Sequence, residues 1–294
     1  MNLLAKDLVQ SSLITKITEV AKFFRNCHQP KAWLEEEGAL KPPMPSNVRW
    51  NSVVNLFEWY KNSWTKLKNI IETHAFYFAS SNAKSVAQNI RNLVLYQNVD
   101  DAIKCLRPVA YALNILQSND VSCGQAVDVW KVLLETYREN GSEYREWLEC
   151  AERRYSKSVP VVWMLANVLH PEHIGAKLTP KELKDVKDYV AEFHPEALPE
   201  FIDFLSEGSG VMASSFKKAS GCKVESFLKV CKQTREISEK IADLSLKMLR
   251  LIPSTAGLER VFSTMGFVHC DLRNRLDPEK VGKLAFCLRA LKSE

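Results

Sequence analysis

Glu259 and Arg260 form a charged pair within the stretch Ser254–Gly266, whose other residues are apolar or small. A glutamate can bind a divalent metal ion for phosphoryl transfer, but two-metal chemistry needs several oxygen ligands around ions about 3.5–4 Å apart. Alternatively, a glutamate in the first turns of a helix is stabilised by the helix dipole, and an arginine beside it faces solvent. The residues alone favour this second interpretation.

Arg49 and Trp50 are a candidate DNA contact, because arginine binds phosphate through two parallel hydrogen bonds and tryptophan stacks on an unpaired base. The alternative is a role in the core. Trp50, Phe57 and Trp64 recur at seven-residue intervals, which places them on one face of a helix. We favour the core interpretation.

Arg273 and Arg275 are further candidates for contacts with DNA phosphates. They can equally form ion pairs with the neighbouring Asp271 and Asp277, and we favour the ion pairs. The net charge of +5 is compatible with a polyanionic partner. It is far from the dense basic clusters of dedicated nucleic-acid arms.

Cysteine and histidine show no spacing typical of a metal site. The eight cysteines are scattered without a CxxC pattern, which favours reduced thiols over a disulfide framework or a zinc finger. His170 and His173 are three residues apart, but Pro171 interrupts the helix that would align them, and no cysteine or carboxylate pattern completes a site. We therefore expect loop residues and no metal site.

Apolar residues with helical spacing predict the elements that position these groups. They predict one long helix over 3–24, or two that meet near Ser11-Ser12, and a helix over 50–74. Further helices are predicted at 83–95, 99–118, 123–139, 142–169, 224–251, 255–266 and 278–292. Because no alternating β-branched run is long enough for a sheet, we expect a mainly α fold.

Proline, glycine and serine mark the connections. Four prolines and one glycine in 28–47 predict a connection, and the Ser/Gly-rich segment 206–223 is the most linker-like. Thr179-Pro180 and Asp277-Pro278 are capped helix starts. With no signal-peptide pattern and no run of eighteen apolar residues, we expect no membrane partner and an intracellular location, nuclear or cytoplasmic.

Three blocks of the sequence, 49–60, 165–178 and 251–291, together resemble the C-terminal half of hAT-superfamily transposases. The third block is the specific one and resembles the region called the hAT dimerisation domain. Its residues in family register are Pro253, Glu259, Arg260, Phe262, Ser263, Gly266, Arg273, Asn274, Arg275, Leu276, Pro278 and Glu279. The resemblance covers nearly the whole chain.

The resemblance implies a mainly α fold with a helical insertion domain and the C-terminal helices of an incomplete RNase H-like fold. It implies four regions: a remnant of the RNase H-like region at 1–48, the all-α insertion domain at 49–205, a linker or exposed loop at 206–223, and the dimerisation region at 224–294. The sequence departs from the family in two ways. It has no tryptophan-rich motif before the terminal block and no BED-type zinc finger.

Intact members of the family bind divalent metal on three carboxylates, and the glutamate among them matches Glu259. The two aspartates would lie upstream of this chain's first residue, so Glu259 is expected to be vestigial and the protein not to be an enzyme. No cofactor is expected, unless the missing aspartates are supplied and a metal such as Mg²⁺ binds.

Because the terminal region resembles a domain that the family uses for dimerisation, the resemblance implies association with a second copy or with a related hAT protein. The candidate contact residues form an apolar set: Val261, Phe262, Leu276, Val281, Leu284, Leu288 and Leu291. A monomer could bury the same residues internally. Two other functions stay open: a fragment of an active transposase with Glu259 as third metal ligand, and a DNA-binding module that uses Arg49, Trp50, Arg273 and Arg275.

Overall fold

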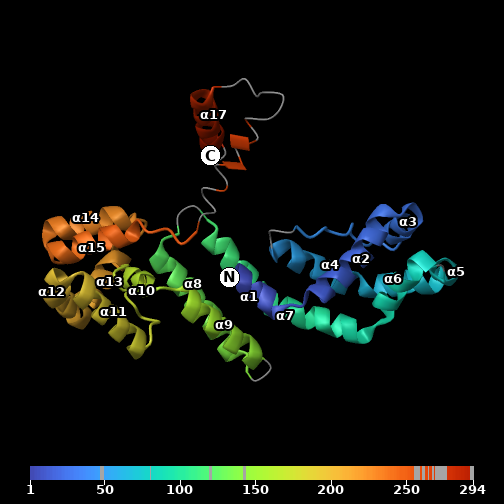
Figure 1. Cartoon of the computed structure of the whole chain (residues 1–294), viewed down its shortest axis with the longest axis horizontal. Helices are drawn as coiled ribbons and strands as arrows, with labels where there is room; N and C mark the ends of the chain where they lie inside the picture. The colour runs from blue at the N-terminus through green and yellow to red at the C-terminus, as the bar shows by residue number, and fades with distance from the viewer. Residues whose placement is uncertain are drawn as a thin grey trace. The chain divides into compact units, whose positions relative to one another are not determined.

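The computed structural model in Figure 1 describes residues 1–46, 50–79, 81–118, 121–141, 144–254, 259, 262–263, 265–266, 268 and 277–291. In this described part the chain is mainly α, as predicted. It divides into two compact units, Met1–Leu113 with Trp130–Ser158, and Asn114–Val129 with Val159–Glu294. Two of the three divisions, at 113/114 and 129/130, fall inside helices, and the third, at 158/159, lies between two helices. None coincides with the boundaries predicted at 48/49, 205/206 and 223/224.

The first unit is built from the N-terminal helices and a later helical hairpin. Its helices are α1 (Asn2–Leu8), α2 (Ser11–Asn26), α3 (His28–Glu36), α4 (Trp50–Thr73), α5 (Ala75–Phe78), α6 (Ser81–Arg91), α7 (Leu93–Leu116) as far as Leu113, α8 (Cys123–Glu139) from Trp130, and α9 (Arg145–Ser158). The chain leaves α1 at Val9 in an extended conformation, so the alternative of two helices over 3–24 is confirmed.

The prediction of a connection over 28–47 is wrong for its first part, because α3 occupies His28–Glu36. Pro30 is compatible with this helix since it lies in the first turn, where a backbone N–H has no acceptor within the helix. Pro30 and Leu34 are buried, so packing stabilises a helix that the local sequence does not predict. The helix ends before Gly38, whose φ of 64° is favourable for glycine.

Helix α4 supplies the core of the first unit. Its residues Phe57, Tyr60 and Leu67 have no exposed surface, and the helix contacts α2, α3, α5 and α6. Two polar side-chain groups of α4 donate hydrogen bonds to backbone carbonyl oxygens of α6. The Tyr60 hydroxyl donates to the carbonyl oxygen of Asn89 at 3.2 Å, and the Trp64 indole N–H donates to that of Ile90 at 2.9 Å.

The remaining helices of the first unit are joined by buried and half-buried polar contacts. The hydroxyl of Tyr137, which is fully buried on α8, donates to the carbonyl oxygen of Cys105 at 2.6 Å. Helix α1 contacts α9, where the guanidinium of Arg154 donates two hydrogen bonds to the carboxylate of Asp7. These bonds hold the pKa of Asp7 below its usual value, because they stabilise the charged form.

The second unit is built from shorter helices. They are the first turns of α8, then α10 (Val161–Val168), α11 (Pro180–Phe193), η2 (Pro195–Ala197), α12 (Leu198–Asp203), the π-helical turn η3 (Phe204–Gly208), α13 (Ser209–Lys218), α14 (Val224–Thr234), α15 (Glu239–Leu249) and α17 (Pro278–Leu291). No helix of the described chain has the length and apolar character that a membrane crossing requires.

A close approach between two backbones anchors α10 in the second unit. Gly124, in the first turn of α8, lies against the backbone of Ala166. The side-chain amide of Asn167 donates to the Gly124 carbonyl oxygen at 2.8 Å, and Asn167 is 2% exposed. Helix α10 also contacts α11 and α15, so it lies at the centre of this packing. Figure 1 shows α14 and α15 side by side in the same unit.

The predicted linker at 206–223 is wrong over most of its length, since η3 and α13 cover Phe204–Lys218. Met212 is fully buried there, and Phe216 makes an edge-to-face contact with Phe227 of α14. The burial of these apolar side chains stabilises a helix there despite the serines and glycines. The helix predicted over 224–251 is interrupted, because Arg235 adopts a left-handed conformation with φ of 59°.

The capped start predicted at Thr179 is confirmed. The Thr179 hydroxyl accepts from the Glu182 N–H at 3.3 Å, and the Glu182 carboxylate accepts from the Thr179 N–H at 2.7 Å. We expect Thr179→Ala to lower the free energy of unfolding of the second unit by about 1 kcal/mol, because it removes one half of this capping box. Urea denaturation measures the change. Thr234→Ala, at an exposed position of a helix in the same unit, is the control, and an equal loss in both variants would contradict the capping role.

Candidate functional site

Helix α17 carries the last of the predicted association residues, and its start has the predicted form. The Asp277 carboxylate accepts from the Glu279 N–H at 3.4 Å, and the Val281 N–H donates to the Asp277 carbonyl oxygen at 3.0 Å. Lys283 forms an ion pair with Glu279 one turn earlier, at 2.8 Å. The helix predicted over 278–292 is therefore confirmed as Pro278–Leu291.

The terminal segment buries some apolar side chains and exposes others. Val268 and Val281 are 2% and 5% exposed, so Val281 packs within a single chain and is not available to a partner. Leu284, one turn after Val281 on the same stripe, is 43% exposed, and Phe262 is 68% exposed. Two of the predicted contact residues are thus accessible. Phe286 is 75% exposed but projects from a different face of α17 than Leu284.

Glu259 is helical and exposed. A group of three or more His, Cys, Asp or Glu side chains at metal-binding distance is found at one place in the described chain, and Glu259 does not belong to it. The described residues therefore do not supply the second and third carboxylates that a two-metal site at Glu259 would need.

Trp50 begins α4 and lines a cavity of about 480 Å³ in the first unit. The other residues of the wall come from α2, α4 and the segment before α4: Ile14, Thr15, Thr18, Glu19, Lys22, Met44, Pro45, Ser46 and Val53. Trp50 is half-buried, whereas Phe57 is fully buried, so the predicted core face is confirmed for Phe57 and is partial for Trp50. The charged residues of the described wall are Lys22 and Glu19, whose charges are opposite. The wall therefore lacks the net positive charge of a phosphate-binding groove.

Several predicted residues lie outside the described part of the chain. They are Arg49, Val261, Arg273, Arg275 and Leu276, together with the side chains of Leu288 and Leu291. The proposed ion pairs of Arg273 and Arg275 and their proposed phosphate contacts therefore stay predictions.

No family model matches the chain, and no curated protein matches it. The resemblance to hAT transposases thus stands on the motifs of the sequence.

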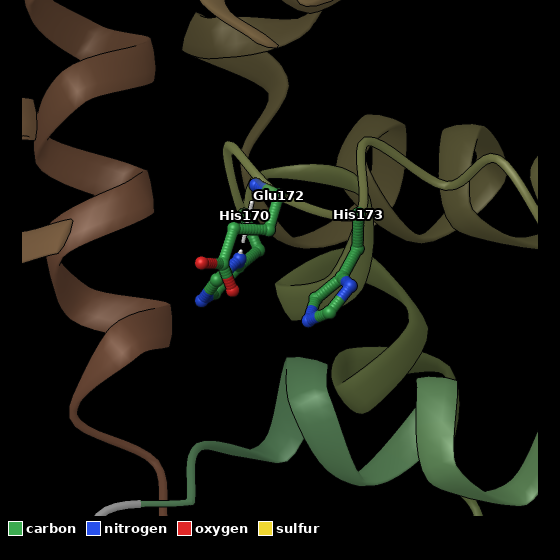
Figure 2. A group of neighbouring side chains, drawn as sticks. All are labelled: His170, Glu172 and His173. Atoms are coloured by element: carbon green, nitrogen blue, oxygen red, sulfur yellow. Dashed lines mark hydrogen bonds between the residues drawn. The ribbon is translucent and has the colours of Figure 1, made fainter. Parts of the chain in front are cut away.

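A cluster that the sequence analysis considered and rejected as a metal site lies in the loop after α10. His170 and His173 are loop residues, as predicted, but their rings stack with centroids 4.5 Å apart. Figure 2 shows the Glu172 side chain beside them, and an Asp128 carboxylate oxygen lies 3.8 Å from His173 Nδ1. The signal in the sequence was the tetrapeptide HPEH itself, because a tight turn brings its first and fourth residues together as well as a helix does.

Proposed function

We propose that this chain is a transposase-derived protein that acts by associating with a second copy of itself, and that Phe262 and the Leu284 stripe of α17 carry the contact. We further propose that its terminal helices derive from an RNase H-like fold and have no nuclease activity. Its motifs at 49–60, 165–178 and 251–291 support this origin.

The exposure of Phe262 and Leu284 is the observation that carries the association. The terminal segment already buries Val268 and Val281, so it has an internal packing of its own and still leaves these two large apolar side chains in solvent. Burying a leucine or phenylalanine contributes about 1.5–3 kcal/mol each. A self-complementary contact uses each side chain twice, once from either copy.

The number of carboxylates near Glu259 supports the proposed lack of nuclease activity. Glu259 is exposed, and within the described residues it is outside any cluster of potential metal ligands. One carboxylate does not hold two ions in place against the charge that develops in phosphoryl transfer. The proposed activity is therefore binding.

Analytical ultracentrifugation of the purified chain tests the association. We expect a monomer–dimer equilibrium with a dissociation constant on the order of 1–100 µM, because a small apolar contact must offset the entropy lost on association. Leu284→Lys is expected to weaken the dimer by at least about tenfold, since it places a charge in the contact. Phe262→Ser is expected to weaken it by a similar factor.

Two variants control for the loss of exposed apolar surface in general. Phe286→Ser changes a residue of the same helix but another face, and Phe76→Ser removes a side chain of the first unit that is 96% exposed. Both are expected to leave the dissociation constant unchanged. A strict monomer at tens of micromolar, or a dimer that Phe76→Ser weakens as much as Leu284→Lys does, would overturn the proposal.

A further inference from the structure

The loop after α10 is a tight, hydrogen-bonded turn rather than an open connection. The His170 carbonyl oxygen accepts from the N–H groups of both His173, at 3.1 Å, and Ile174, at 2.9 Å. Gly175 follows with φ of 69°, and a side chain there would meet Val168 at 2.9 Å. The backbone of the loop therefore holds His170 and His173 on the same side of the turn.

Three potential ligand atoms converge in this turn. One ring nitrogen each of His170 and His173 and a carboxylate oxygen of Glu172 lie within 4.8 Å of one another. Figure 2 shows the two imidazoles facing a common space, with the Glu172 carboxylate in front of the His170 ring. Ligands of tetrahedral zinc lie at about 2.0–2.1 Å from the ion. The two imidazoles stack with 28° between their planes, so metal binding requires their rings to rotate until both lone pairs point at the ion, as well as a closer approach of the ligand atoms.

One ring nitrogen of His173 lacks a hydrogen-bond partner. Nε2 of His173 is buried and, among the described residues, makes no hydrogen bond. An Asp128 carboxylate oxygen lies 3.8 Å from Nδ1 of the same ring and favours the proton on Nδ1. Nε2 then presents a bare lone pair, which is the form that binds metal. At 3.8 Å Asp128 is beyond hydrogen-bond distance of Nδ1, so it would have to move closer to orient a metal-bound His173.

Both rings are neutral near pH 7. Burial, together with a smaller effect of the neighbouring His173, lowers the pKa of His170 to about 3. Burial also lowers the pKa of His173, although the nearby carboxylates of Asp128 and Glu172 oppose the shift. Neither imidazole therefore has to be deprotonated before it binds a cation. His170 Nδ1 accepts from the Glu172 N–H at 3.3 Å, a long hydrogen bond that a metal bond can replace.

We propose that His170, Glu172 and His173 form a binding site for one transition-metal ion of the zinc class, with Asp128 orienting His173. Two imidazoles and one carboxylate are a ligand set that zinc accepts, with a fourth position left for water. The ion would connect the loop to α8 through Asp128 and so stabilise the second unit. This site shares no residue with the proposed association surface at Phe262 and Leu284.

Isothermal titration of the metal-free chain with Zn²⁺ tests the site. We expect one ion per chain, a higher Tm with Zn²⁺, and no comparable binding of Mg²⁺, which prefers oxygen ligands. His170→Gln and His173→Gln are each expected to weaken binding by at least about 100-fold, and Asp128→Asn by about 10–100-fold. His194→Gln is the matched control, because His194 is also a half-buried histidine of this unit with a glutamate, Glu196, 4.0 Å away.

Cobalt substitution keeps the test independent of stability and of the cysteines. Co²⁺ bound in the site is expected to give visible absorption bands without the intense near-ultraviolet band of a cobalt–thiolate bond. Far-UV circular dichroism establishes that each variant is folded. A thiolate band in the original chain, the absence of Zn²⁺ binding, or equal binding by the His170→Gln/His173→Gln double variant would overturn the proposal.

Discussion

Replacing Gly124 with alanine is expected to lower the free energy of unfolding of the second unit by about 3 kcal/mol or more. A Cβ at this position would lie 2.6 Å from the carbonyl oxygen and 2.8 Å from the carbonyl carbon of Ala166. Both are backbone atoms of α10, so no side-chain rotation relieves the clash. Either helix α8 or helix α10 must shift, and the hydrogen bond from Asn167 to the Gly124 carbonyl oxygen lengthens with it.

Gly210→Ala is the matched control for this substitution. Gly210 also lies in a helix, α13, but a Cβ there meets no atom within 4 Å of the described structure. Alanine at that position is expected to leave stability unchanged or to raise it by up to about 1 kcal/mol, because alanine favours the helix. Thermal and urea denaturation of both variants measure the difference. A loss below about 0.5 kcal/mol for Gly124→Ala would show that the contact between α8 and α10 yields easily.

The helices that the sequence predicts well are those whose own residues specify them. Apolar spacing predicts α4, and the pair Thr179 and Glu182 predicts the start of α11 as a capping box. The residues of α3 and α13 do not specify a helix so clearly. Their prolines, glycines and serines predict connections, and the buried side chains of Leu34 and Met212 show that packing against distant segments decides the outcome.

The break between α14 and α15 was also beyond prediction. Arg235 adopts φ of 59° although nothing in its identity favours the left-handed region. The Glu236 N–H donates to the Cys231 carbonyl oxygen at 3.0 Å, which closes the end of α14, and Ser238 caps the start of α15 by accepting from the Ile241 N–H. The serine cap could have been predicted, whereas the arginine conformation could not.

The candidate sites also combine features that the local sequence predicts with features that depend on distant contacts. Leu284 was predicted to lie on an apolar stripe, because the period of a helix determines which residues share a face, but its exposure was left open. The burial of Val281 was not predicted, since periodicity identifies an apolar face but not what covers it. Asp128 approaches His173 from a helix far earlier in the chain, and no local pattern in the sequence shows such a contact.

Phe57→Ala is expected to lower the free energy of unfolding of the first unit by about 3–5 kcal/mol. Phe57 has no exposed surface and lies on the face of α4 that packs against its neighbouring helices. The substitution removes the apolar contacts of the ring and leaves a cavity that the close-packed helices fill incompletely. Phe57→Leu retains most of the volume and is expected to cost about 1 kcal/mol.

The other two aromatic residues of the seven-residue series make this prediction more specific. Trp50→Ala is expected to cost only about 1 kcal/mol, because Trp50 is half-buried at a cavity wall. Trp64→Ala should lie between the two, since the ring of Trp64 contacts that of Tyr96 in a tilted arrangement with centroids 4.4 Å apart and its indole N–H donates to Ile90. Urea denaturation of the three variants, followed by circular dichroism, gives the order. If Trp50→Ala proved the most destabilising, Trp50 would be a core residue like Phe57, and the expected order would be wrong.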